Sequence, residues 1–373
     1  MQNELCLKLL SDLVAFKSVT PQGDEAIDYC EKFLKKIGFE CNKLRFGDVS
    51  NLYAKIGNSE KNLCFAGHVD VVPPLDCWTS DPFVLTERNG LLYGRGTNDM
   101  KGGLSAGLSA IAKFLTNNNP NFSISVILTS DEEVMGKNGT NKVVEWLKSN
   151  DEKITGCILC ESCSPAKTGE YIKIGCRGSL NIDFNFQGKQ CHVVNGSKYG
   201  NQLHKFIEFL TQFSNTKLDD GNKNFTTSDI EMTSVDVGNS VRNIIAGKAS
   251  AKFSIRFNDM WDFDKLETFI IYKLPKNVSV HFERCGLPFI GTNEDFIDFL
   301  SKSIKTTLKI APEIGTAGGN SDAQSLHKIT NVVEIGTPIE NAHIVNEFIA
   351  KEELEKLFNI YNGILCNFDN WKL

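Results

Sequence analysis

Seven residues of the types that bind metal ions stand near the ends of short apolar segments or in the loops between them. They are His68, Asp70, Asp99, Glu132, Glu133, Glu161 and His343. Imidazoles and carboxylates gathered at one point would bury unpaired charge unless a cation held them. This mixture of carboxylates and imidazoles suits zinc or a neighbouring first-row divalent metal. If one carboxylate bridges, five ligands can hold two metal ions about 3.5 to 4 Å apart.

The apolar segments that lead to these residues are predicted to be strands of one sheet. They cover 62–66, 124–129, 157–160 and 331–335, and most of their residues are apolar without interruption. Runs of this kind are expected of strands that are covered on both faces. In open α/β sheets, ligands bind beyond the carboxyl ends of the strands. We therefore expect side chains as far apart as positions 68 and 343 to converge at one edge of this sheet.

Helical patterns alternate with these strands. Apolar residues repeat with helical spacing over 24–37 and over 101–115, and Gly38 stands where a helix C-cap would lie. Leu354 and Tyr361 belong to a similar pattern near the end of the chain. Alternation of strands and helices is typical of βαβ units and a largely parallel sheet.

The hydrophobic pattern changes after Gly178. Segments 180–186, 253–257 and 278–282 alternate apolar with polar residues, which is typical of an antiparallel sheet with one wet face. A helix is predicted between the first two of these strands, over 203–210. These elements form a small α+β domain of their own.

The simplest organisation is an α/β fold with a second domain inserted. Residues 1–177 and 288–373 form one discontinuous α/β domain, and residues 178–287 form the inserted α+β domain. The chain has 373 residues, enough for two to three domains, and 41% apolar residues, which excludes a disordered or fibrous protein.

The charge balance is mildly acidic, with 46 Asp and Glu against 40 Lys and Arg. Without a basic block the chain lacks the electrostatic features that bind nucleic acid or an anionic membrane. Glu4, Lys8 and Asp12 interrupt the N-terminal apolar pattern, so no signal peptide is expected. No segment approaches the roughly 18 to 20 apolar residues that cross a bilayer. We expect a cytoplasmic protein in which the twelve cysteines are reduced.

The cysteines provide an alternative from another functional class. Cys157, Cys160 and Cys163 have the C-x2-C-x2-C spacing, which suggests an iron–sulfur cluster or a non-catalytic metal-binding module. The next cysteine is Cys176, which is too far along for the bacterial ferredoxin pattern. Residues 157 and 160 are also an odd number apart on a predicted strand, so they point to opposite faces. Buried thiols are the favoured interpretation.

Six segments together resemble the M20 metallopeptidase family along essentially the whole chain. They are GHVDVVPP, GRGTNDMKGG, TSDEE, CILCES, GCRGS and NAHIVNE. The resemblance implies a zinc hydrolase whose discontinuous catalytic domain carries an inserted, ferredoxin-like dimerisation or lid domain. It also implies two Zn²⁺ per subunit, with Co²⁺ able to substitute. Within the family, the closest resemblance is to members that hydrolyse N-succinyl-LL-2,6-diaminopimelate. Acetylornithine deacetylation or peptide hydrolysis is the alternative.

The resemblance also implies a role for each candidate residue of the centre. The first metal is bound by His68 and Glu161, the second by Glu133 and His343, and both by Asp99. Asp70 orients the imidazole of His68, and Glu132 is the general base. The last role agrees with the chemistry, because one carboxylate can complete the deprotonation of a metal-bound water whose pKa is near 7.

Further residues are implied to bind the substrate. Family members of this type are homodimers in which a histidine of the inserted domain acts in the partner's active site, and His192 matches it. The candidate substrate-binding residues are Arg177, Ser179, Asn243, Arg256, Gly318 and Gly319. Guanidinium groups suit the carboxylates of such a substrate. Ser162 and Cys176 depart from the family, which more often has Pro and Arg there.

Overall fold

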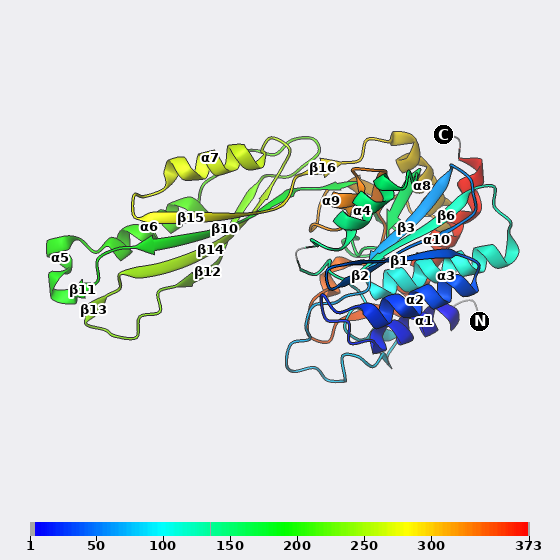
Figure 1. Cartoon of the computed structure of the whole chain (residues 1–373), viewed down its shortest axis with the longest axis horizontal. Coiled ribbons are helices and arrows are strands. Elements are labelled where there is room, and N and C mark those ends of the chain that lie inside the picture. Colours follow the sequence, from blue (N-terminus) through cyan, green and yellow to red (C-terminus); the bar gives the residue numbers. More distant parts are fainter. Residues whose placement is uncertain (1–3, 135, 372–373) are drawn as a thin grey trace. The chain divides into compact units, whose positions relative to one another are not determined.

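The computed structural model of the chain describes residues 4–134 and 136–371, which form two compact units (Figure 1). Unit 1 is built from the chain up to Gly175 and again from Gly291 onward. Unit 2 comprises Cys176–Ile290 and is inserted between these two segments.

An eight-stranded mixed sheet forms the centre of unit 1. Its strands, in spatial order, are β1 (Glu40–Phe46), β2 (Val49–Ile56), β6 (Ser123–Thr129), β3 (Asn62–His68), β7 (Gly156–Leu159), β18 (Asn331–Glu334), β8 (Tyr171–Lys173) and β17 (Glu313–Gly315). β3 runs parallel to β6 and β7, and β7 runs parallel to β18. These are the four strands predicted from apolar runs, so that prediction is confirmed. Because they are parallel, their carboxyl ends lie at the same edge of the sheet.

The helices of unit 1 pack against this sheet and against one another. They are α1 (Glu4–Ala15), α2 (Asp24–Lys36), α3 (Lys101–Asn117), α4 (Thr140–Ser149), α8 (Glu294–Leu308), α9 (Ala323–Leu326) and α10 (Lys351–Asn367), with 3-10 helices η2 (Ile339–Asn341) and η3 (Phe368–Asn370). α3 contacts β3, α1 and α10, and Leu104, Leu108 and Ile111 of its apolar stripe are buried. The helices predicted over 24–37 and 101–115 are confirmed as α2 and α3. None of the helices within the described residues is long and apolar enough to cross a membrane.

A smaller sheet joins the last part of the chain to the segment before Asp99. Its strands are β19 (Phe348–Ala350), β5 (Leu91–Tyr93) and β4 (Thr86–Arg88), all antiparallel. The pairing of β19 with β5 brings the residues after His343 beside the residues before Asp99. Elsewhere β9 (Gly175–Cys176) pairs with β16 (Phe289–Ile290).

Unit 2 is an antiparallel sheet with one face covered by helices. The sheet order is β12 (Asp229–Asp236), β14 (Lys248–Phe257), β10 (Gly178–Gln187) and β15 (Val278–Gly286). Its helices are α6 (Gln202–Ser214), α7 (Phe263–Lys273), the short α5 (Gly196–Tyr199) and the 3-10 helix η1 (Val193–Asn195). β11 (Cys191–His192) pairs with β13 (Ile244–Ile245) beyond the main sheet. Phe184 and Phe253 of the sheet pack against Phe213 of α6 in a shared apolar cluster that Leu266 of α7 also joins.

Two of the main elements of unit 2, β12 and α7, were not predicted from the sequence. β12 has almost no buried residues and an irregular register around Met232, so it lacks the alternation that indicates a strand. α7 buries only Leu266 and Ile270, so its apolar stripe is weak. With both included, the main elements follow the order βαββαβ, which is that of ferredoxin-like domains.

Candidate metal centre

The structure of unit 1 brings five predicted ligands together as two groups that share Asp99. One group is His68, Asp99 and Glu161, and the other is Asp99, Glu133 and His343. Within each group the ligand atoms lie within 4.8 Å of one another. Oδ1 of Asp99 lies 3.1 Å from Nε2 of His68, and Oδ2 lies 3.2 Å from Nε2 of His343. The two oxygens of one carboxylate therefore face two different imidazoles, as a bridging ligand requires.

Each group is completed by a second carboxylate. Oε2 of Glu161 lies 3.4 Å from Nε2 of His68, and Oε1 of Glu133 lies 3.0 Å from Nε2 of His343. Among the residues that the structure describes, neither group contains a cysteine. The geometry therefore gives no support to the iron–sulfur alternative.

The electrostatics of this cluster indicate that it is built for cations. Burial opposes a charge on His68, yet the Asp99 and Glu161 carboxylates raise its pKa well above the usual value. Hydrogen bonds to Asp99 and Glu133 raise the pKa of His343 to about 10. Burial raises the pKa of Glu161 to about 8. In the metal-free protein, protons thus supply positive charge that divalent cations can replace, so the donor set fits a dinuclear centre.

These raised pKa values predict that metal binding releases protons. At pH 7.5 both imidazoles are protonated in the metal-free protein, and each must lose its proton to become a ligand. We expect zinc to displace about two to three protons, one per imidazole and part of the Glu161 proton. Proton competition weakens as pH rises, so apparent zinc affinity should increase from pH 6.5 towards about 10.

Titration calorimetry in buffers of different ionisation enthalpy measures this proton release. The His343→Asn variant should release about one proton fewer than the wild type. A binding enthalpy that does not change with the ionisation enthalpy of the buffer would mean that no proton is released, and it would contradict the assignment of the two imidazoles as ligands.

Asp70 holds the first imidazole and the 132–133 turn together. Nδ1 of His68 lies 2.9 Å from the main-chain carbonyl of Asp70, which only accepts hydrogen bonds, so Nδ1 carries the proton and Nε2 is free to bind metal. The Asp70 carboxylate accepts main-chain N–H bonds from Glu132 and Glu133 at 3.4 and 3.1 Å. Asp70 therefore positions residues at the ends of both β3 and β6.

Close packing of α3 places Asp99 near Glu161. A Cβ atom at Gly103 would lie 2.0 Å from the carbonyl oxygen of Cys160, so only glycine allows this approach. Ser162 donates its main-chain N–H to Oε1 of Glu161 at 2.9 Å. A proline at position 162 would lack this donor. Ser162 thus adds a hydrogen bond to a candidate ligand carboxylate.

Glu132 lies beside the centre but belongs to neither ligand group. Its Oε2 lies 4.0 Å from Nε2 of His68. Burial, together with the negative charges of Asp322, Glu161 and Glu133, raises its pKa well above the usual value. This carboxylate therefore lies outside both candidate ligand groups, and its surroundings favour the protonated form.

Two acidic residues near the centre were missed by sequence reasoning. Burial raises the pKa of Asp322 to about 7, and its charge acts on Glu132. Glu347 is fully buried and contacts the loop that carries Asp99. Their signals in the sequence were weak: Asp322 follows the Gly318–Gly319 turn, and Glu347 stands four residues after His343.

Three of the candidate substrate-binding residues gather at one end of the sheet of unit 2. Ser179 and Arg256 are directly paired across β10 and β14, and Arg256 donates to the hydroxyls of Ser179 and Ser254. Arg177 donates to the Asp229 carboxylate at 2.5 Å. Burial and the positive charge of Arg177 lower the pKa of Arg256. An anion at this end of the sheet would relieve the repulsion between the two guanidinium groups.

His192 and Asn243 gather beyond the opposite end of the same sheet. Both side chains are exposed, and the main-chain N–H of Val193 donates to the carbonyl of Asn243 at 2.9 Å. Nδ1 of His192 accepts the N–H of Val194 at 3.2 Å, so in the neutral ring Nε2 carries the proton. His192 therefore presents a hydrogen-bond donor to solvent.

Gly318 and Gly319 lie in unit 1, where Lys173 donates to the Gly319 carbonyl at 2.7 Å.

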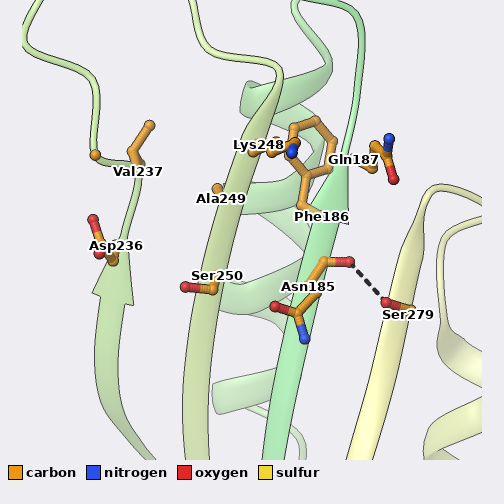
Figure 2. A pocket seen from close by; sticks show the side chains of 10 residues that line it. Asn185, Phe186, Gln187, Asp236, Val237, Lys248, Ala249, Ser250 and Ser279 are labelled. Carbon is orange, nitrogen blue, oxygen red and sulfur yellow. Dashed lines mark hydrogen bonds between the residues drawn. The ribbon is translucent and has the colours of Figure 1, made fainter.

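A cavity of about 410 Å³ opens on unit 2 but contains none of the predicted site residues. It lies over the ends of β10, β12, β14 and β15, and its lining includes Asn185, Asp236, Lys248, Ser250 and Ser279 (Figure 2). Ser279 donates to the Asn185 carbonyl at 3.4 Å across two of these strands. The cavity offers no cluster of metal ligands, so the candidate chemistry stays with the two groups of unit 1.

Comparison with known proteins agrees with this geometry. The model of peptidase family M20/M25/M40 matches residues 64–367. The chain is 40% identical to succinyl-diaminopimelate desuccinylase of Wolbachia pipientis subsp. Culex pipiens (strain wPip), over 97% of this chain and 93% of that protein. It is 38% identical to the protein of the same name from Orientia tsutsugamushi (strain Ikeda), over 99% and 97%.

Solved structures show the same fold at lower identity. An M20 family metallo-carboxypeptidase from Sulfolobus solfataricus superposes with a TM-score of 0.82 at 19% identity, covering 98% of this chain and 99% of that one. The chain therefore belongs to peptidase family M20/M25/M40.

Proposed function

We propose that this protein is a metal-dependent amide hydrolase that converts N-succinyl-LL-2,6-diaminopimelate and water to succinate and LL-2,6-diaminopimelate. The observation that carries the proposal is a pair of ligand groups that share Asp99, with the buried Glu132 carboxylate beside them and in neither group. Relatives that bear the name of this activity are 37 to 40% identical over nearly the whole chain.

The proposed cofactor is a pair of Zn²⁺ ions, with Co²⁺ able to substitute. His68 and Glu161 would hold one ion, Glu133 and His343 the other, and Asp99 both. When bound, such ions polarise a substrate carbonyl and lower the pKa of water to near 7. The imidazole and carboxylate ligands match what zinc accepts in catalytic sites.

Glu132 is the proposed general base. It takes a proton from the attacking water and later delivers that proton to the amine that leaves. A raised pKa suits the first task, because it makes the carboxylate a stronger base towards the attacking water. Its lack of ligand contacts leaves both oxygens available for these transfers.

The guanidinium groups of unit 2 are the proposed carboxylate receptors. The substrate carries three carboxylates, and Arg256 is held between hydroxyl groups, with no acidic partner among its hydrogen bonds to residues 4–134 and 136–371. Arg177 would either release the Asp229 carboxylate to bind a substrate carboxylate or bind both carboxylates at once. Ser179, Asn243 and the Gly318–Gly319 turn are proposed as further polar contacts.

We also propose a homodimer in which His192 serves the partner's active site. Arg256 and His192 lie at opposite ends of β10, and a strand of ten residues spans roughly 30 Å. One copy of unit 2 therefore cannot bring both residues to one small substrate. The edge strand β12 exposes Met232 and Val235 beside an unpaired backbone edge, which suits contact with a second copy.

The dimer proposal predicts complementation between two inactive variants. Glu132→Gln lacks the general base, and His192→Ala lacks the hydrogen-bond donor of the imidazole ring. Each variant alone should therefore be inactive. In a mixed dimer, the subunit with intact Glu132 receives an intact His192 from its partner. Random mixing in equal amounts should therefore restore about a quarter of wild-type activity, since half the dimers are mixed and each has one complete site.

Mixing Glu132→Gln with Glu133→Gln is the matched control, because both lesions then lie in unit 1. In that mixture both subunits keep an intact His192, but unit 1 of each subunit carries a lesion. Neither active site can therefore be rescued by its partner. Absence of recovery in the His192 mixture, with mixed dimers present, would contradict action of His192 in the partner's site.

A substrate comparison tests the proposed reaction. The zinc-loaded protein should hydrolyse N-succinyl-LL-2,6-diaminopimelate with a kcat/KM at least about 10²-fold higher than N-acetylornithine. The physical reason is that the shorter substrate carries fewer carboxylates, so the half-buried guanidinium group of Arg256 is left without a carboxylate partner. A preference for acetylornithine would move the protein to the deacetylase branch, and no hydrolysis of either would refute the proposal.

A further inference from the structure

We propose that Glu347 is a positioning residue that sets Asp99 and His343 relative to each other. The side chain is fully buried, at 0% exposure, and lies four residues after His343. Its carboxylate faces the loop that leads into Asp99 and accepts hydrogen bonds from that loop. The inference rests on the proposed two-metal function, because it concerns how two of the ligands are held.

The Glu347 carboxylate accepts four hydrogen bonds from one loop. Oε1 accepts the main-chain N–H groups of Asn98 and Asp99 at 2.8 and 3.1 Å. Oε2 accepts the N–H of Gly96 at 3.1 Å and Nη1 of Arg95 at 2.7 Å. The ligand Asp99 is thus held through its own main-chain N–H.

The main chain around Glu347 is fixed as well. Its carbonyl accepts the N–H of Gly94 at 3.1 Å, and β19 begins at the next residue and pairs with β5. Since β5 leads into the 94–99 loop, the carboxylate is aimed at that loop by a short sheet. Little freedom remains for the side chain to take another position.

A second connection joins the other end of the His343 loop to the same place. The Asn98 side chain donates to the carbonyl of Pro338 at 2.7 Å and accepts from the hydroxyl of Thr337 at 2.9 Å. The loop that carries His343 is therefore attached to the Asp99 loop at both of its ends. Between these two connections, His343 adopts a left-handed backbone conformation with φ 61°, which costs energy in a non-glycine residue.

Loss of the Glu347 charge would affect the two ligand groups unequally. Buried N–H donors without partners are unfavourable, so the loop would rearrange to satisfy them. The group of Asp99, Glu133 and His343 has two of its three ligands on the connected segments. The group of His68, Asp99 and Glu161 has only one. Metal affinity should therefore fall mainly in the group that contains His343.

Zinc titration of the metal-free Glu347→Gln protein tests the inference. We expect two zinc ions to bind to the wild type. In the variant, one ion should bind about 10- to 100-fold more weakly, the range found for residues that orient ligands, while the other changes less. The spectrum of the Co²⁺-loaded protein should show the same loss at one of two sites, which gives a readout independent of turnover.

Glu334→Gln is the matched control. Glu334 is also buried, at 1% exposure, and forms an ion pair with Lys173 at 2.8 Å, but it has no contact with the 95–99 loop among the hydrogen bonds of the described residues. The Glu334→Gln variant should lower the unfolding temperature about as much as Glu347→Gln does, and it should leave both zinc affinities unchanged. If Glu347→Gln fails to fold, Thr337→Val removes one of the two hydrogen bonds of the second connection at nearly constant volume and should weaken the same ion by a smaller factor.

The outcomes separate this inference from the proposed function. A wild type that binds no zinc refutes the two-metal proposal itself. A wild type that binds two ions, with unchanged affinities in Glu347→Gln, overturns the positioning role alone. Equal weakening in Glu334→Gln would also overturn it, because the effect would then be general destabilisation.

Discussion

Replacement of Glu132 by Gln is expected to lower kcat by about 10²- to 10⁴-fold, the usual contribution of a general base. The amide keeps the size of the side chain but cannot accept the proton of the attacking water. Because Glu132 belongs to neither ligand group, the variant should still bind two zinc ions. Steady-state kinetics with metal analysis on the same preparation measures both effects.

The adjacent residue provides the comparison for this variant. Glu133→Gln removes a ligand whose oxygen lies 3.0 Å from Nε2 of His343, so it should lose metal from one group as well as activity. Loss of metal in Glu132→Gln with retention in Glu133→Gln would mean that base and ligand are assigned the wrong way round. Retention of more than about a tenth of the activity in Glu132→Gln would remove its role as base.

The parallel core of unit 1 was predictable because burial leaves a direct mark on its sequence. β3, β6, β7 and β18 are covered on both faces, and an uninterrupted apolar run follows from that environment. β12 shows the opposite case. It is mostly exposed, so no periodic burial constrains its residues, and only its pairing with β14 makes it a strand.

The convergence of the candidate ligand residues was predictable for a related reason. His68 ends a buried strand, Glu133 and Glu161 lie in the loops just after two others, and the topology of a parallel sheet brings such positions to one edge. The residues that hold these ligands were not predictable in this way. Glu347 acts on a loop some 250 positions earlier in the chain, through main-chain N–H groups that any residue type would provide.

Asp99→Asn is expected to weaken both metal ions at once, by more than about 100-fold, the upper range for residues that merely orient ligands. Asp99 is the one residue common to both groups, and its two oxygens face His68 and His343 at 3.1 and 3.2 Å. An amide retains one oxygen but presents N–H donors in place of the other, and these repel a cation. Zinc content after dialysis and titration of the metal-free protein measure the loss.

His343→Asn distinguishes a shared ligand from a general disturbance of the centre. It removes a ligand from one group only, so about one zinc ion should remain bound with near wild-type affinity. Asp99→Asn should retain neither ion under the same conditions. If it instead keeps one ion as tightly as His343→Asn does, Asp99 serves a single group. The two groups would then be independent sites.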